Sequence, residues 1–116
     1  MDVVYSPEVQ KWPEDLPRLQ LASNLLAEIL GPVSSGLVKA DWQRSDQNGH
    51  TLYRLTIRDF TGPVFTDFSR DELENPLHMR VRLYRLWGDL LQIRNNQQHH
   101  QVQIISGQVA ANVGGQ

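Results

Sequence analysis

Cysteine is absent from this 116-residue chain, which excludes disulfide bonds, thiolate zinc sites, iron–sulfur clusters and cysteine nucleophiles. Long hydrophobic runs are missing too: no stretch approaches the ~20 apolar residues that span a bilayer, and the first residues lack the pattern of a secretion signal. Eleven basic against thirteen acidic residues give a net charge of −2, which is too small to attract nucleic acid or an anionic membrane through a general field. We therefore expect a soluble, cytoplasmic protein that does not bind membranes.

The length predicts one compact domain, because domains typically contain roughly 100–150 residues. We expect an N-terminal arm over residues 1–15, an α+β domain over 16–95 and a tail over 96–116. From Asn95 onward the chain contains six glutamines and three glycines, a composition typical of a partly flexible segment.

The first predicted helix covers residues 16–30. Asp15 can cap its N-terminus, and Gly31-Pro32 is a signal that ends a helix. Between these two signals Leu19, Ala22 and Leu26 recur at helical spacing, which predicts one buried face.

A first β-hairpin is predicted around Asn48-Gly49, because both central positions of a type I′ turn need positive φ. This turn pairs Trp42 with Leu55 and Arg44 with Tyr53 on the side of the sheet that faces the core. Lys39 pairs with Arg58 on the other side. A slip of one residue would mix polar and apolar side chains on each face, so the register is well specified.

A second hairpin is predicted at Gly62-Pro63, because glycine suits the first central position of a type II′ turn and proline the second. This turn pairs Arg58 with Asp67 and Phe60 with Phe65 on the outer side. The predicted strands then cover 37–45, 51–60 and 64–68.

The second helical region begins at Ser69, which forms a capping box with Glu72, and restarts at Asn75-Pro76 as a long helix over 76–95. The fold class is therefore α+β, with two helices on one face of a three-stranded antiparallel meander in the order α-β-β-β-α. A further edge strand can come from residues 101–106 of the tail or from the N-terminal arm at 3–5.

The outer face of this sheet is the predicted interaction surface. Exposed hydrophobic side chains that lie together mark association sites. Leu37, Phe60 and Phe65 supply the apolar centre, and Arg54, Arg58 and Asp67 supply the polar rim. We therefore expect this surface to bind a protein partner, or a second copy of the chain in a homodimer. The alternative is that the N-terminal arm (1–15) or the tail (96–116) covers it. Pairing through an edge strand at 101–106 is a second predicted contact.

Nucleic-acid binding is the alternative function, and it would use four arginines of the second helix: Arg80, Arg82, Arg85 and Arg94. The order of elements over 16–95 resembles that of double-stranded-RNA-binding domains. Those domains place lysines at the start of the final helix, where residues 69–74 of this chain are mostly acidic. The resemblance is therefore one of element order only and transfers no binding residue.

Catalysis has little support in the sequence. No glycine-rich phosphate loop precedes a helix, and the four histidines (His50, His78, His99 and His100) fall in a hairpin loop, a first helical turn and the tail. Nucleophilic catalysis needs a hydroxyl, an imidazole and an acid that converge. We expect a non-enzymatic protein with no cofactor and no specific metal site.

Overall fold

The computed structural model describes residues 1–114, with side chains as far as Gln97. The fold is α+β, as the sequence predicts, and the described residues form a four-stranded mixed sheet with three α-helices. In chain order the elements are β1 (Asp2–Tyr5), α1 (Pro7–Gln10), α2 (Leu16–Ser35), β2 (Lys39–Gln47), β3 (His50–Asp59), β4 (Gly62–Ser69), the 3-10 turn η1 (Glu72–Glu74) and α3 (Pro76–Gly114).

The first hairpin is confirmed residue by residue. Asn48 and Gly49 have φ values of 52° and 77°, so both central turn residues are left-handed, as a type I′ turn requires. Trp42 lies opposite Leu55, and Lys39 lies opposite Arg58. Local turn chemistry therefore sets the register between β2 and β3.

The register predicted for the second hairpin is wrong. The strands close at Asp59 and Gly62, so the turn residues are Phe60 and Thr61 rather than Gly62-Pro63. The Asp59 carboxylate holds this turn by accepting a hydrogen bond from the Thr61 backbone N–H at 2.7 Å. Because the pairing shifts by an even number of residues, each β4 side chain keeps its predicted face.

The predicted extra edge strand comes from the N-terminal arm. β1 lies parallel to β2, with Asp2 opposite Lys39 and Tyr5 opposite Trp42, so the sheet order is β1-β2-β3-β4. The purely antiparallel three-stranded meander is thereby corrected to a mixed four-stranded sheet. α1 and α2 lie between the parallel strands in sequence, and such a connection needs a dozen residues or more.

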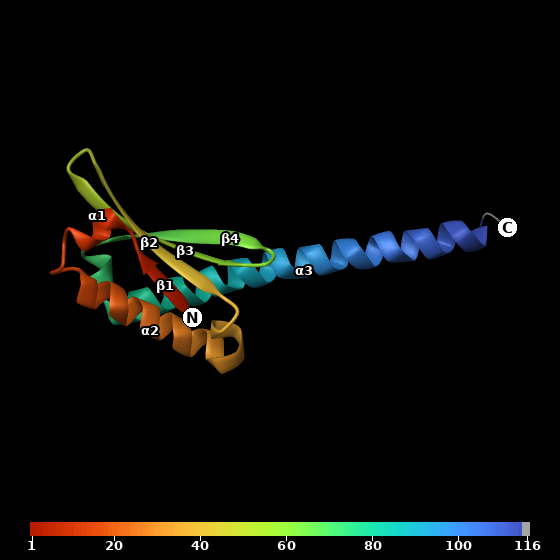
Figure 1. The fold of residues 1–116 in the computed structure, drawn as a ribbon, viewed down its shortest axis with the longest axis horizontal. Coiled ribbons are helices and arrows are strands. Elements are labelled where there is room, and N and C mark those ends of the chain that lie inside the picture. Colours follow the sequence, from red (N-terminus) through yellow and green to blue (C-terminus); the bar gives the residue numbers. More distant parts are fainter. Residues whose placement is uncertain (115–116) are drawn as a thin grey trace.

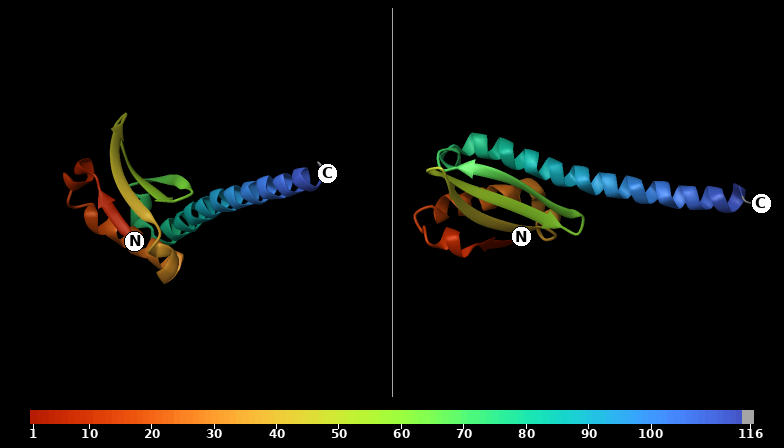
Figure 2. Two further views of the ribbon diagram at one scale, coloured as in Figure 1. Left: turned by 45° about the vertical axis from the view of Figure 1, so that its right-hand side comes forward. Right: turned by 90° about the horizontal axis from the view of Figure 1, so that it is seen from above.

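Both long helices pack on one face of the sheet, as Figures 1 and 2 show. α2 contributes Leu19 and Leu26, α3 contributes Leu83 and Leu90, and the inner face of the sheet contributes side chains that include Trp42. All five of these side chains are fully buried. The regular part of α2 ends as predicted, because Gly31 has φ 81° and ψ 170°.

α3 is much longer than predicted. It continues to Gly114 and projects well beyond the sheet (Figure 1). The strand predicted at 101–106 is therefore not formed, and these residues are helical. No glycine or proline occurs from residue 89 to 106, so the sequence has no signal that stops the helix there. Despite this length, neither α3 nor any other described helix is apolar enough to cross a membrane.

Candidate interaction surface

The outer face of the sheet is not covered by either long helix, as the view from above shows (Figure 2, right). The strand registers place one row of side chains across the whole face, namely Val4, Asp41, Thr56 and Phe65. Within this row Val4 and Phe65 are both more than half exposed. The face therefore combines apolar and charged groups in contact with solvent.

The predicted contact between Phe60 and Phe65 is also corrected by the new register. Phe60 lies in the turn and is 85% exposed, whereas Phe65 lies opposite Thr56 in β3. Four residues of strand separate Thr56 from Phe60, which corresponds to roughly 13 Å. Phe60 instead shares a hollow of about 270 Å³ with Leu37. The apolar centre is thus divided into a Leu37–Phe60 part and a Phe65 part.

Ion pairs surround the apolar side chains of this face. Arg54 donates two hydrogen bonds to the Asp67 carboxylate, at 2.8 and 3.1 Å, and its guanidinium lies 4.0 Å from the centre of the Phe65 ring. The hydrogen bond from Arg54 to Asp67 raises the pKa of this arginine. Arg58, which the sequence analysis pairs with Asp67, contacts Asp41 at 3.3 Å instead. The predicted rim residues are therefore all on the face, but with different partners.

The arginines of α3 divide into two classes. Arg82 forms an ion pair with Glu72 and donates to the Asp67 backbone carbonyl, and Arg94 contacts Asp59 at 2.6 Å. These two arginines are therefore paired with acidic side chains of the same chain, Glu72 and Asp59. Arg80 and Arg85 are exposed, and no ion pair is found for them among the described side chains. The four arginines predicted for nucleic-acid contact are thus not equivalent.

The free edge of β4 is blocked at three of the four residues whose backbone groups point away from β3. Pro63 has no backbone N–H to offer, the Asp67 carbonyl accepts from Arg82, and the Ser69 backbone N–H donates to Glu72 at 2.9 Å. Backbone groups that are missing or already bonded prevent an edge strand from pairing with another chain. Contact through the face of the sheet is therefore favoured over contact through this edge.

A buried charged cluster, which the sequence analysis missed, lies at the end of the sheet near the start of α2. Asp15 is only 1% exposed, and its carboxylate accepts hydrogen bonds from the Tyr53 hydroxyl, from Arg70 at 3.0 Å and from Arg18 at 3.3 Å. A fourth group, the guanidinium of Arg44, lies 3.6 Å away. Asp15 precedes α2 as predicted but makes no side-chain capping bond. We call this group the Asp15 cluster.

Arg44 is the second buried charge of the Asp15 cluster, with a side chain only 5% exposed. Its guanidinium lies 4.0 Å from the centre of the Trp12 ring and donates to the Tyr53 hydroxyl at 3.0 Å. Burial, followed by the hydrogen bond to Asp15, raises the pKa of Tyr53 to about 12. One signal could have revealed the cluster: the predicted register already placed Arg44 beside Tyr53 on the core side, where a buried guanidinium needs an acid.

Two acids that join α3 to the sheet have lowered pKa values. Burial alone raises the pKa of Asp59, but hydrogen bonds from Arg94 and Thr61 outweigh it. Burial likewise raises the pKa of Glu72, and bonds from Ser69 and other donors again lower the net value. A carboxyl whose folded pKa is depressed stabilises the protein above its unfolded pKa of about 4, and this contribution is lost as the pH falls further.

We therefore expect the free energy of unfolding to fall as the pH decreases below about 4. Asp59→Asn should flatten this dependence, because the substituted side chain does not titrate, and should also lower stability at pH 7 by leaving Arg94 unpaired. Urea denaturation at a series of pH values measures both effects. The matched control is Asp71→Asn at an exposed position. An unchanged acid slope in Asp59→Asn would contradict the assignment.

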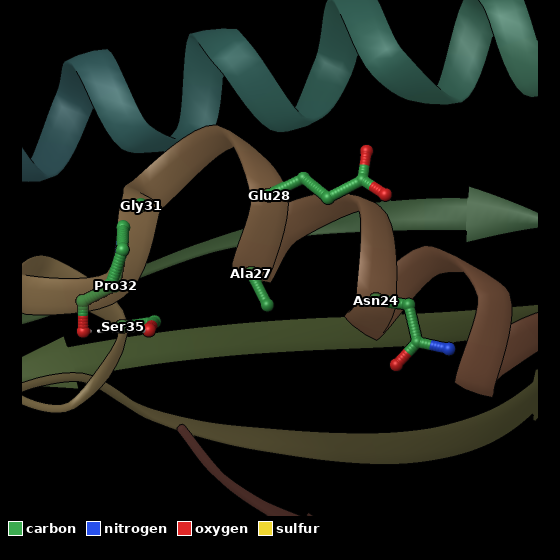
Figure 3. Close-up of a pocket in the computed structure, with 6 residues that line it drawn as sticks. All are labelled: Asn24, Ala27, Glu28, Gly31, Pro32 and Ser35. Carbon is green, nitrogen blue, oxygen red and sulfur yellow. Dashed lines mark hydrogen bonds between the residues drawn. The ribbon is translucent and has the colours of Figure 1, made fainter.

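A hollow of about 370 Å³ lies beside the Gly31 break in α2. Figure 3 shows that the Glu28 carboxylate and the Asn24 amide diverge and do not face a common point. Binding pockets need polar groups that converge on a ligand. Among the described residues there is also no cluster of three or more histidine or acidic side chains that could hold a metal ion. The outer sheet face is therefore the best candidate surface.

No protein-family model, curated protein or solved structure matches this chain.

Proposed function

We propose that this protein is a non-enzymatic interaction module that binds a protein partner, or a second copy of itself, through the outer sheet face. The observation that carries the proposal is the exposure of apolar side chains on a face that no described helix covers. Val4 and Phe65 lie on this face, and Leu37 and Phe60 share a hollow with Lys39 and Arg58 at its end; all four apolar side chains are more than half exposed. Apolar side chains concentrated on one face favour association with another protein.

The charges of the outer face support a protein partner more than a phosphate backbone. Arg54 and Arg58 are each paired with an acid of the same face, Asp67 and Asp41. A surface whose charges are already paired has no strong cationic footprint, which nucleic-acid binding requires. Paired charges at the rim also suit a protein interface, where charged residues are depleted from the centre.

The double substitution Phe60→Ser and Phe65→Ser is expected to abolish the complexes that form through this face. Both rings are more than half exposed, so the change removes apolar contact area without opening the core. Sedimentation of the full chain over a wide concentration range measures self-association, and affinity capture with the same chain as bait measures binding of a foreign partner.

The matched control is Val33→Ser, because Val33 is 79% exposed but lies on α2, away from the sheet face. Association through the face should change little with salt, whereas RNA binding through Arg80 and Arg85 should weaken steeply from low to moderate salt. A double variant that retains every complex of the wild-type chain contradicts the proposal. Salt-sensitive RNA binding that persists in that variant supports the alternative function instead.

A further inference from the structure

A hollow with both apolar and cationic walls lies at the end of the outer sheet face, where β2 begins and β3 ends. Its volume is about 270 Å³, and the residues that line it are Leu37, Lys39, Arg58, Asp59 and Phe60. We call it the Leu37–Phe60 hollow. Its two apolar residues are 61% and 85% exposed, and Phe60 is the most exposed large hydrophobic residue among those described. Two such side chains in one hollow offer apolar area that a partner can cover.

Two positive charges lie side by side in the wall of this hollow. Lys39 of β2 is directly opposite Arg58 of β3 on the outer face. Like charges at directly opposed positions of an antiparallel pair destabilise a sheet. The Arg58 guanidinium contacts the Asp41 carboxylate at 3.3 Å, whereas the exposed Lys39 has no ion pair among the described side chains. The Lys39 ammonium is therefore available to an anion of a partner.

The acids near the Leu37–Phe60 hollow do not cancel this charge. The Asp59 carboxylate is fully buried and contacts Arg94 of α3 at 2.6 Å, so its charge is already compensated from the inner side. Asp2 lies opposite Lys39 in β1, but no ion pair joins these two side chains in the described structure, and Asp2 does not line the hollow. An anion that enters the hollow therefore meets two cations and no exposed carboxylate in its wall.

We propose that the Leu37–Phe60 hollow binds an acidic segment of a protein partner, in which a carboxylate side chain adjoins a large apolar side chain. The apolar side chain packs against Leu37 and Phe60, and the carboxylate accepts charge-assisted hydrogen bonds from Lys39 and Arg58. The inference rests on the proposed function, because it names what the partner contributes at one end of the outer sheet face.

The walls of the hollow favour such a segment over two other occupants. A phosphate backbone is bound by an extended cationic surface, whereas only two cations line this hollow, beside two apolar side chains that a phosphate does not use. A second copy of the same hollow is unfavourable as well. It would bring another Lys39 and Arg58 against the first pair, and like charges across an interface repel.

The test uses the blocked tripeptide Leu-Glu-Phe as probe and the uncharged Leu-Gln-Phe as its matched control. An NMR titration of the isotope-labelled full chain measures binding through the backbone amide shifts of residues 37–39 and 58–60. We expect both peptides to shift these amides and the acidic one to bind up to about fivefold tighter, which is the upper range for one exposed ion pair. Unshifted amides, or equal affinity for the two peptides, would overturn the proposal.

Three variants of the chain assign the contacts. Lys39→Gln should largely abolish the preference for the acidic peptide, and Phe60→Ser should weaken both peptides about equally. Phe65→Ser is the control, because Phe65 belongs to the other apolar part of the face, and it should change neither affinity. A Lys39→Gln chain that keeps the full preference contradicts the proposal. A short single-stranded RNA that displaces the acidic peptide from these residues would show a phosphate site and also contradict it.

The same measurements separate this inference from the proposed function. If the complexes of the wild-type chain vanish in the chain with serine at both 60 and 65, but the two peptides bind equally, only the inference fails. If the hollow prefers the acidic peptide, but every complex persists in that double variant, the proposed function fails and the peptide site stands.

Discussion

Replacing Asp15 by asparagine is expected to lower the free energy of unfolding by about 3–5 kcal/mol, which is typical when one partner of a buried ion pair is removed. Asp15 is 1% exposed, and the nearby guanidinium of Arg44 is also buried. Without the carboxylate, the buried Arg44 loses a counter-ion and the Tyr53 hydroxyl loses its charged acceptor. Urea denaturation at neutral pH, with the change in midpoint at constant slope, measures the loss.

The matched control for this substitution is Glu14→Gln, because Glu14 is the exposed acid next in sequence. A surface change of this kind should alter stability by no more than about 0.5 kcal/mol. Tyr53→Phe should have an intermediate effect of about 1.5–3 kcal/mol, because it removes the hydroxyl that bonds to Asp15 and Arg44 but leaves both charged groups in place. Equal effects of Asp15→Asn and Glu14→Gln would show that the Asp15 cluster does not stabilise the fold.

Truncating Trp42 to alanine is expected to lower stability by about 3–5 kcal/mol, through lost burial and the cavity that remains. The Trp42 ring is fully buried, lies 6.0 Å from the Phe68 ring and donates a hydrogen bond to the Ser23 hydroxyl of α2 at 2.9 Å. It therefore joins the sheet to the first long helix. The same denaturation experiment measures the effect.

The conservative change Trp42→Phe separates packing from hydrogen bonding. It keeps an aromatic ring in the core and removes the indole N–H, so we expect a smaller loss of about 1–3 kcal/mol. Ser23 still donates to the Leu19 carbonyl at 2.8 Å, so its hydroxyl is not left without a partner and the loss of stability is smaller. If both substitutions at Trp42 destabilised the protein equally, the hydrogen bond rather than packing would dominate at this site.

The two hairpins show which part of the fold is encoded locally. Asn48 and Gly49 both adopt positive φ, so the turn alone sets the first register. The second hairpin has a competing glycine signal, and Gly62 does have positive φ, at 138°, but as the first residue of β4. The actual turn is held by the local bond from Thr61 to Asp59 and also by a contact distant in sequence, because Arg94 of α3 binds the same Asp59 carboxylate. A short turn motif cannot reveal such a contact.

The sequence predicted which side of the sheet carries the candidate surface, but not which side chains touch each other on it. The alternation of polar and apolar residues along β3 and β4 places Arg54, Phe65 and Asp67 on the outer side in either register. Which side chains touch depends on the position of the turn, and the Phe60–Phe65 contact was therefore wrong. Asp15 was predicted only as a helix cap, because its bond to Arg70 joins residues 55 positions apart.

The parallel pairing of β1 with β2 closes the longest connection between neighbouring strands of the sheet. Adjacent antiparallel strands close through short turns, whereas Asp2 meets Lys39 only after α1 and α2 have been placed between them. Closing such a long loop carries a larger entropic penalty than closing a turn. During biosynthesis the N-terminal strand is made first, yet it must wait for β2 before its backbone is paired. β1 therefore joins the sheet at a larger entropic cost than β3 or β4, whose connections are short turns.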